Sequence, residues 1–194
     1  MALTNLHRAG WLKKIIYAIW RKDNLNKYEK IATHLKGKRV VDIGSGFGLM
    51  VDFLNKKGYD TIGLDIREAQ LPGNRPPQLY DGKHMPFKGK SFDTSLILTV
   101  LHHTSNHESI LLEASRISKR IIIIEDIYRN LLQKWLTFFV DSVVNWEFAS
   151  HPHSNRSDRQ WKALFQEIGL NCVAHSNYRY MIFFRQAVYV IAVE

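Results

Sequence analysis

The sequence predicts an open α/β fold, in which a mostly parallel β-sheet carries helices on both faces. Three observations predict it. Short apolar strands alternate with helical segments along the 194 residues. A glycine-rich turn directly follows the first predicted strand. The last two predicted strands, over 170–178 and 187–193, have no predicted helix between them, which indicates an antiparallel pair that closes the sheet.

The first third of the chain begins with helices. Apolar residues recur at helical spacing over 11–20, and a second helix is predicted over 25–35. Arg39–Ile43 is predicted to be the first buried strand because almost all of it is apolar. A tight turn at Gly44–Gly48 leads into a helix over about 49–57.

The same strand and helix pattern then repeats. Thr61–Leu64 is a short strand that ends at Asp65, and Ser95–Leu98 is another. Glu108–Ser118 has the spacing of a helix. The β-branched run Arg120–Ile124 is typical of a central parallel strand, because such strands are buried on both faces.

The C-terminal part departs from this alternation. Trp161–Ile168 is predicted to be a helix, and Gly169 ends it. The two strands that follow, over 170–178 and 187–193, are expected to pair with each other. Right-handed crossovers between the earlier strands complete the predicted topology.

Composition is that of one globular domain. Hydrophobic residues make up 45% of the chain, and the longest apolar runs are too short to cross a bilayer. The N-terminus lacks the separate apolar block of a secretory signal. The single cysteine, Cys172, excludes an internal disulfide and favours a reducing, cytoplasmic location. We expect Cys172 to pack near a strand rather than to act as a nucleophile.

The formal charge of +9 permits an anionic partner without identifying one. Much of the excess lies before position 40, where lysine and arginine are spread along predicted helices rather than gathered in one block. A solvated surface is therefore the favoured interpretation. An anionic substrate, a peripheral contact with lipid or a nucleic acid are the alternatives, and nucleic acid is the least favoured.

The glycine turn is the most informative motif. Val40–Gly48 combines a buried strand with the glycine spacing G-x-G-x-G, whereas a dinucleotide fingerprint has G-x-G-x-x-G and here has Leu49 in the sixth position. Asp42 is an acid in an otherwise apolar strand. A buried carboxylate without a partner is costly, so we expect Asp42 to accept hydrogen bonds from the turn or to face a cationic ligand.

Over roughly residues 35–125 the sequence resembles the class I S-adenosylmethionine-dependent methyltransferases of the small-molecule type. The glycine turn with Asp42 matches the family's first motif, and Asp65 matches the acid that binds the ribose hydroxyls. Asp81–Phe87 resembles the segment against the adenine ring, and 92–103 resembles the fourth strand and its exit. The resemblance implies these cofactor-binding residues: Asp42, Gly44, Ser45, Gly46, Gly48, Asp65, Ile66, Asp81, Gly82 and Thr99.

The resemblance also implies a Rossmann-like, seven-stranded, mostly parallel sheet with an antiparallel C-terminal strand pair. A single domain is expected over 1–194. Its predicted parts are N-terminal helices over 1–35, a cofactor-binding core over 36–128, a helical lid or insertion over 129–160, and a C-terminal helix with strands over 161–194.

The chemistry of the cofactor agrees with these residues. S-adenosylmethionine has a sulfonium cation, a zwitterionic tail, a diol and an aromatic base, so its site needs carboxylates and an apolar slot more than basic groups. Asp42, Asp65 and Asp81 all lie near the ends of predicted strands. The alternatives are that Asp65 caps the next segment and that Asp81 belongs to a plain turn with Gly82.

Candidate catalytic residues follow the fourth and fifth predicted strands. His103, Glu125 and Asp126 are placed where an acceptor group would lie, and His102 is a further possible base. The histidines are better explained as pocket wall or helix start, and the acids could instead orient a lid. His103 and His107 have helical spacing, but no convincing set of further ligands accompanies them, so we predict no metal site.

The predicted function is methyl transfer from S-adenosylmethionine to a small, partly hydrophobic acceptor. The alternatives are an NAD-type oxidoreductase, an RNA or protein methyltransferase, and a binding module that has kept only the fold. The aromatic segment 131–149 is expected to roof the acceptor pocket together with the N-terminal helix, or else to form extra core or a dimer surface.

Overall fold

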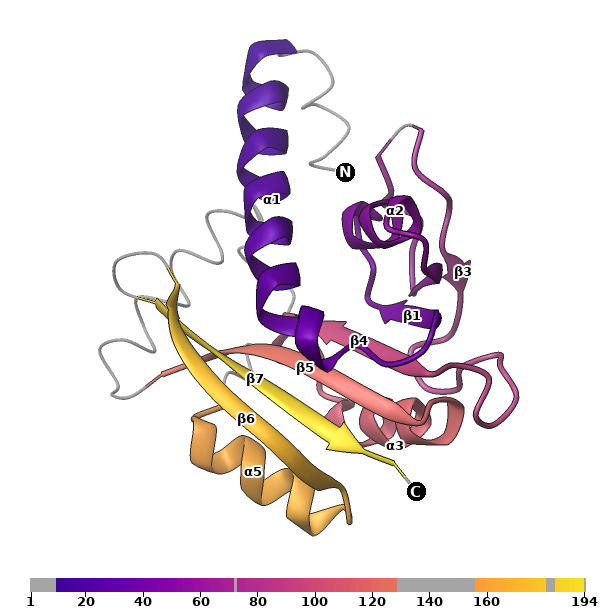
Figure 1. The fold of residues 1–194 in the computed structure, drawn as a ribbon, viewed down its shortest axis with the longest axis vertical. Helices are drawn as coiled ribbons and strands as arrows, with labels where there is room; N and C mark the ends of the chain where they lie inside the picture. Colours follow the sequence, from indigo (N-terminus) through magenta and orange to yellow (C-terminus); the bar gives the residue numbers. More distant parts are fainter. Residues whose placement is uncertain (1–9, 72, 129–155, 181–183, 194) are drawn as a thin grey trace.

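Seven strands form one sheet in the order β3-β2-β1-β4-β5-β7-β6 (Figure 1). The computed structural model describes residues 10–71, 73–128, 156–180 and 184–193. The five parallel strands are β1 (Arg39–Ile43), β2 (Asp60–Asp65), β3 (Gln78–Leu79), β4 (Thr94–Leu98) and β5 (Arg120–Ile127). The seven-stranded, mostly parallel sheet expected from the sequence is confirmed.

The C-terminal strands close the sheet as an antiparallel pair. Strand β7 (Phe184–Ala192) pairs antiparallel with β5 on one side and with β6 (Asn171–Tyr180) on the other. Strand β6 therefore forms the outer edge of the sheet, and the later strand β7 lies between β6 and β5. This arrangement confirms the predicted antiparallel pair.

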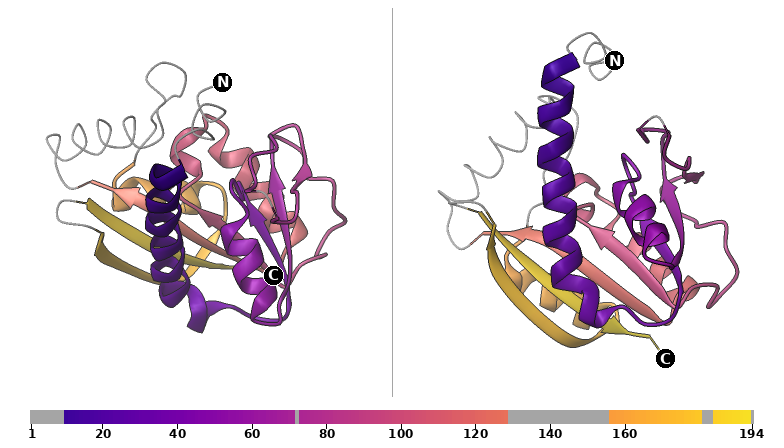
Figure 2. Two further views of the ribbon diagram at one scale, coloured as in Figure 1. Left: turned by 90° about the horizontal axis from the view of Figure 1, so that it is seen from above. Right: turned by 45° about the horizontal axis from the view of Figure 1, so that its top comes forward.

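Helices cover both faces of the sheet (Figure 2). Helices α1 (Gly10–Ile31) and α2 (Leu49–Lys56) lie on one face, and α3 (His107–Ile117) and α5 (Asp158–Glu167) lie on the other. Two short 3-10 turns, η2 (Ala32–His34) and η3 (Leu101–His103), complete the described elements.

The central strand β5 shows why both faces need a cover. Ile121 and Ile123 pack in the core beneath α3 and α5, whereas Ile122 and Ile124 pack with α1 and α2. All four isoleucines are fully buried. An uninterrupted apolar run is thus explained by burial on both faces, as in parallel sheets generally.

One helix replaces the two that were expected at the N-terminus. The prediction of separate helices over 11–20 and 25–35 is wrong, because α1 runs without a break from Gly10 to Ile31. The polar residues 21–24 contain no proline or glycine that would end a helix. Asp23 and Lys27 instead form an ion pair of 2.9 Å one turn apart within the helix, which joins its two halves.

Other differences concern the ends of elements. The short strand β3 (Gln78–Leu79) had no signal in the apolar pattern, because both of its residues are exposed. Strand β5 continues past Ile124 to Ile127. The expected aromatic insertion over 131–149 and the pair His151 and His153 lie outside the described residues, so the predicted division at 129–160 stays a prediction.

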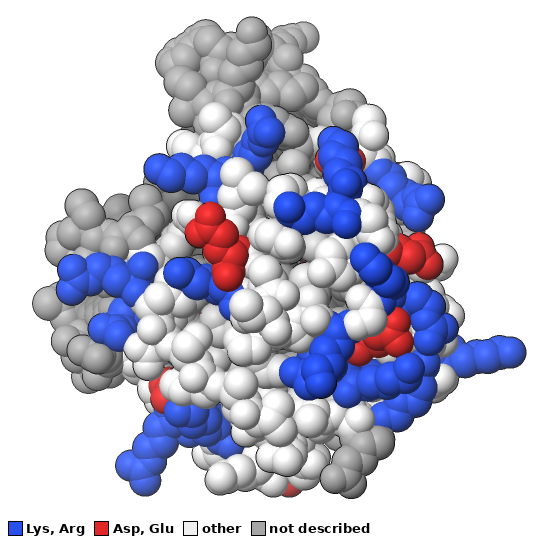
Figure 3. All heavy atoms as spheres, viewed as in Figure 1, with Lys and Arg blue, Asp and Glu red and all other residues white. Residues whose placement is uncertain are grey.

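Basic side chains are distributed over the face that α1 and α2 cover. Lysine and arginine outnumber the acids there, and uncharged surface separates them into several groups (Figure 3). This distribution agrees with the solvated surface favoured from the sequence. Within the described part of the chain, the search for a helix long and apolar enough to cross a membrane found none.

Trp161 offers a test of the core beneath α5. Its side chain is fully buried, and its ring lies 6.2 Å from that of Phe165 and 5.6 Å from that of His107. We expect Trp161→Ala to lower the free energy of unfolding by about 3 to 5 kcal/mol, because it leaves a large cavity. Urea denaturation followed by circular dichroism measures the change.

The matched control is Leu112→Ala on α3, where the leucine is 47% exposed. We expect that substitution to change the free energy of unfolding by about 0.5 kcal/mol or less. Equal losses in the two variants would contradict the described packing.

Candidate functional site

The predicted site residues gather at the edge of the sheet where the parallel strands end. Asp42 lies one residue before the end of β1, Asp65 ends β2, and Thr99 directly follows β4. Asp126 lies near the end of the neighbouring strand β5. In open α/β sheets, ligands bind at this edge. We call this edge, with the glycine turn 44–48, the rim.

The glycine turn is tightly packed at one position and open at the next. Gly44 has φ +73°, and its N–H donates to the Leu64 carbonyl at 2.7 Å. A Cβ on Gly44 would lie 2.6 Å from Val100 Cγ2, which is too close for a real contact. Gly46 has φ +49°, and a Cβ there would meet nothing within 4 Å. The backbone at Gly46 is therefore accessible to a ligand.

Asp65 connects the second strand to the glycine turn. Its Oδ2 accepts a hydrogen bond from the Gly46 N–H at 2.8 Å. Its Oδ1 accepts from the N–H groups of Ile66 at 2.7 Å and Arg67 at 3.3 Å. Asp65 therefore does cap the segment after β2, as one alternative proposed, and it also lies against the predicted cofactor turn.

Asp42 is buried without a hydrogen-bonded partner among the described residues. Only 4% of the residue is exposed. Burial raises the pKa of Asp42 to about 7, although nearby Lys27 lowers this pKa and Asp65 raises it further. The expected hydrogen bonds from the turn to Asp42 are not found, because Gly46 donates to Asp65 instead. The other expectation, that Asp42 faces a cationic ligand, stays a prediction; within the described residues, Lys27 is a cation whose charge acts on Asp42.

Lys27 is a site residue that the sequence did not reveal. Its ammonium comes from α1, lies 2.9 Å from Asp23 Oδ2 and donates to Thr99 Oγ1 at 3.0 Å. The side chain is only 12% exposed. Its sole signal in the sequence is an acid four residues earlier, and surface lysines share that signal. Only the fold shows that this lysine reaches the rim.

Thr99 has an unusual backbone conformation at the exit of β4. Its φ of +58° is rare for a residue other than glycine. Its hydroxyl donates to the Leu98 carbonyl at 2.6 Å and accepts from Lys27. Its N–H donates to the Ile124 carbonyl at 2.7 Å. These contacts hold a strained residue in place, which is common at functional sites.

The predicted adenine-side residues lie together after β2 and β3. Asp81 is exposed, and its Oδ1 accepts from the N–H groups of Lys83 at 2.8 Å and His84 at 2.7 Å. The His84 and Lys83 hydrogen bonds lower the pKa of Asp81. A Cβ on Gly82 would lie 3.4 Å from Ile66 Cγ2, and Ile66 is 62% exposed. An uncovered apolar side chain thus borders this turn.

Side chains of α3 form hydrogen bonds with the backbone of residues 85–87, which follow the turn at Asp81 and Gly82. Glu113 Oε2 accepts from the Met85 N–H at 2.7 Å, and Arg116 donates to the Phe87 carbonyl at 2.7 Å and to the Met85 carbonyl at 2.9 Å. Arg116 and Glu113 are also paired at 2.6 Å. These two residues could not be predicted from the sequence, because their partners are backbone groups distant along the chain.

Glu125 faces away from Lys27 and fixes the exit of β4. Its Oε1 accepts from the N–H groups of Val100 at 2.9 Å and Leu101 at 2.7 Å, and its Oε2 lies 2.6 Å from His102 Nδ1. Both side chains of this pair are buried, with 0% of Glu125 and 2% of His102 exposed. The His103 ring is 4.0 Å from that of His102 and only half-buried. Glu125 and His102 are therefore placed to hold the loop.

Asp126 lies on the other face of the same strand, beneath α1. Its Oδ1 accepts from Gln186 Nε2 at 2.9 Å, and Gln186 accepts from the Tyr178 hydroxyl at 2.6 Å. Burial raises the pKa of Asp126, and the positive charge of Lys27 is among the groups that lower it. Of the two adjacent acids, Asp126 is the one that lies with Lys27 near the rim.

Helix α1 extends along the rim and contacts it at two points. The Trp20 ring stacks on that of Phe47 in the glycine turn, with 4.0 Å between centroids and 21° between planes. Lys27 reaches Thr99 two turns later. The N-terminal helix therefore covers the place where the predicted cofactor residues meet.

Comparisons with known proteins match the middle of the chain to a protein family. Residues 41–121 match the model of the methyltransferase domain. The matched range includes the glycine turn, Asp42, Asp65, Asp81 and Thr99, so the family resemblance noted from these residues is confirmed.

Curated relatives of the methyltransferase domain align over the same region. A ubiquinone biosynthesis O-methyltransferase from Hahella chejuensis is 27% identical over 96 residues, which are 44% of this chain and 40% of that protein. A demethylmenaquinone methyltransferase from Tropheryma whipplei is 30% identical over 100 residues, which are 46% of this chain and 42% of that protein. The match thus spans less than half the length of either relative.

Solved structures extend the likeness to most of the fold. A SAM-dependent methyltransferase from Archaeoglobus fulgidus has a TM-score of 0.69 at 16% identity, and the match covers 89% of this chain and 94% of that one. Such a likeness confirms a Rossmann-like methyltransferase fold. The match of residues 41–121 to a methyltransferase domain does not favour the alternative of an NAD-type oxidoreductase.

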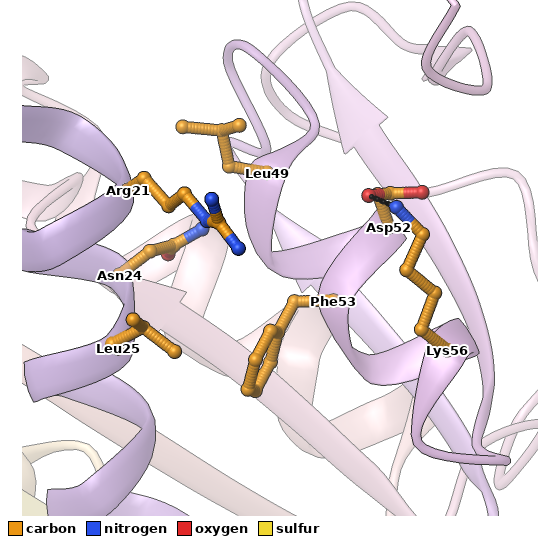
Figure 4. Close-up of a pocket in the computed structure, with 7 residues that line it drawn as sticks. All are labelled: Arg21, Asn24, Leu25, Leu49, Asp52, Phe53 and Lys56. Carbon is orange, nitrogen blue, oxygen red and sulfur yellow. Dashed lines mark hydrogen bonds and ion pairs between the residues drawn. The ribbon is translucent and has the colours of Figure 1, made fainter. Parts of the chain in front are cut away.

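Two cavities lie outside the rim of the methyltransferase domain. One of about 280 Å³ lies between α1 and α2, where Arg21 of α1 points toward Phe53 of α2, and the paired Asp52 and Lys56 also line it (Figure 4). The other, of about 260 Å³, lies between α5 and β6 beside Cys172. Neither is lined by a predicted cofactor residue, so the predicted site is the covered rim and not these cavities.

Cys172 is not placed as a reactive thiol. The Cys172 thiol is half-buried, donates to the Ala174 carbonyl at 3.3 Å, and has its pKa raised by burial, so it is not activated as a nucleophile. In the described ranges, the search for three or more metal-type ligands close together found none.

Gly44 and Gly46 provide a matched pair of substitutions. In both variants, alanine replaces a glycine in the left-handed conformation, which we expect to lower the free energy of unfolding by about 1 to 2 kcal/mol. Only Gly44→Ala also forces a methyl group against Val100, which we expect to add about 1 to 3 kcal/mol. Urea denaturation of the two variants gives the difference. Equal destabilisation would contradict the close contact of the turn with the exit of β4.

Proposed function

We propose that this chain transfers a methyl group from S-adenosylmethionine to a small, partly hydrophobic acceptor. The observation that carries the proposal is the buried Asp42 carboxylate, which has no hydrogen-bonded partner among the described residues and lies beside an open glycine turn. Such a carboxylate needs a cation, and the cofactor has one at sulfur and another at its amino group. The matching methyltransferase domain over 41–121 supports the same function.

The residues of the rim fit that cofactor. The glycine turn and Asp42 would hold the amino-acid end, and Asp65 would accept the ribose hydroxyls. Ile66 offers an exposed apolar side chain to an adenine ring, next to Asp81 and Gly82. Ser45 and Gly48 complete the turn, and Thr99 borders the methyl-donor end. The bound cofactor supplies an activated methyl group on a sulfonium.

The chain's own part in the reaction is alignment and exclusion of water. A displacement at carbon needs its two reactants in line, and holding them so supplies much of the rate enhancement. Helix α1 covers the rim through Trp20 and Lys27, which limits the access of water. Glu125 keeps the loop after β4 in place through Val100 and Leu101.

Asp126 is the favoured proton acceptor if the methylated group is a hydroxyl. Its second carboxylate oxygen makes no hydrogen bond within the described residues, and its raised pKa brings the group closer to neutral pH, where a general base is most effective. Both carboxylate oxygens of Glu125 already have partners in the loop after β4. His103 remains an alternative base, because it is half-buried beside His102.

The acceptor is inferred to be a small molecule with an aromatic or quinone ring. The two curated relatives are named for ubiquinone biosynthesis and for demethylmenaquinone. A macromolecular acceptor is disfavoured, because the exit of β4 reads Leu98-Thr-Val-Leu101 and not the Asn/Asp-Pro-Pro-aromatic signature of base-methylating enzymes. We further propose a cytoplasmic location, which the single cysteine supports.

Ligand binding tests the proposed function directly. We expect S-adenosylhomocysteine, but not NAD, to stabilise the protein by about 2.7 kcal/mol at a hundred times its dissociation constant. Asp65→Ala should abolish the stabilisation because it removes the acceptor for the ribose hydroxyls. Asp52→Ala is the matched control, since this half-buried acid on α2 pairs with Lys56 and is not a predicted cofactor residue. Stabilisation by NAD alone would reject the proposal.

The protonation of Asp42 makes binding depend on pH. With a pKa of about 7 in the free protein, Asp42 is largely protonated in mild acid. A cationic ligand favours the carboxylate and lowers its pKa, so binding releases a proton. Affinity for S-adenosylhomocysteine should therefore increase with pH, by up to about tenfold per unit below about pH 7, and level off above it.

Calorimetric titrations across this pH range measure the dependence. Asp42→Asn has no proton to release, so its profile should be flatter than that of the unmodified protein. Parallel profiles for the two proteins would mean that Asp42 does not meet the ligand's charge.

A further inference from the structure

The ammonium of Lys27 lies where the acids of the rim converge. It pairs with Asp23 at 2.9 Å within α1 and donates to Thr99 Oγ1 at 3.0 Å across the gap between helix and sheet. Its side chain is 12% exposed, so this is a fixed and largely desolvated position. The contact joins residues that are 72 positions apart in the chain.

The electrostatics of two sheet acids also depend on Lys27. The lysine lowers the pKa of Asp42 on β1 and that of Asp126 on β5, against the effect of burial on both. Asp65 acts on Asp42 in the opposite direction. One ammonium from α1 therefore offsets the charge of two sheet carboxylates, of which Asp42 has no hydrogen-bonded partner among the described residues.

Asp42, on whose charge Lys27 acts, is proposed for the amino-acid end of the cofactor, and Thr99, which Lys27 contacts, is proposed to border the methyl-donor end. The amino-acid end has its own ammonium, which needs a carboxylate and neighbouring oxygen acceptors. Two ammonium groups near the same carboxylate would repel each other in a site shielded from water. The Lys27 ammonium and the cofactor ammonium therefore both need oxygen acceptors in the same part of the rim.

We propose that Lys27 occupies the subsite for the cofactor's ammonium group in the free protein and must leave it when the cofactor binds. This inference rests on the proposed function and adds a residue of α1 that sets cofactor affinity. Lys27 can retain its pairing with Asp23 when it leaves, because both residues belong to the same helix. Loading of the cofactor is thereby coupled to release of α1 from Thr99.

Two ligands separate this competition from a general effect on the fold. S-adenosylhomocysteine has the ammonium group, whereas 5′-methylthioadenosine has the same nucleoside and thioether without the amino-acid tail. Removal of the lysine charge should help the first ligand only. The variant is Lys27→Met, and the matched control is Lys22→Met, which removes an exposed lysine from the same helix.

Isothermal titration calorimetry of the full chain provides the readout. We expect Lys27→Met to bind S-adenosylhomocysteine at least about tenfold more tightly than the unmodified protein does, a gain of about 1.4 kcal/mol. Its affinity for 5′-methylthioadenosine should change less than about threefold. Lys22→Met should leave both affinities unchanged.

Weaker binding of S-adenosylhomocysteine by Lys27→Met would overturn the inference, because the lysine would then contribute to the cofactor site. Equal gains for both ligands would also overturn it, since the substitution would only have opened the rim. Lys27→Gln is a second variant that keeps a hydrogen-bond donor for Thr99, and it should show the same selective gain if Lys27→Met fails to fold. Binding of neither ligand by any of these proteins would reject the proposed function itself.

Discussion

The burial of negative charge at the end of β1 is the constraint on which the site depends. Asp42 lies in a strand covered on both faces, so its carboxylate is removed from water without a described hydrogen bond. Asp65 is close enough to raise the pKa of Asp42 further, and Lys27 offsets part of that effect. The glycine turn, the placement of α1 and the strained Thr99 all surround this one carboxylate.

Much of the fold follows from apolar periodicity and from glycine. Strand β1, the turn after it and β5 have strong local signals, because burial on both faces requires apolar runs and left-handed turns require glycine. Strand β3 has no such signal, since both its residues are exposed. Apolar periodicity does not predict the continuity of α1, because the polar stretch 21–24 interrupts the apolar pattern, although it contains no residue that ends helices.

The sequence predicts only those candidate site residues that lie next to a recognisable strand or turn. The acids at the ends of β1 and β2 were located from strand boundaries alone. Glu125 and Asp126 are neighbours in sequence, yet they point to opposite faces of β5, and only the sheet decides which face meets α1. Lys27 and the pair Glu113 and Arg116 act on partners far away in the chain, so no local pattern reveals them.

Because β7 lies beside β5, the proposed sites for the methyl donor and the methyl acceptor use different stretches of the polypeptide. The proposed donor site draws mainly on residues 41–121, which match the methyltransferase domain model, together with Trp20 and Lys27 of α1. Gln186 on β7, which bonds Asp126, and Tyr178 on β6, which bonds Gln186, come from outside that segment. Under the proposed function, a change in the C-terminal hairpin would alter the surroundings of Asp126 while the residues proposed to hold the donor stay the same.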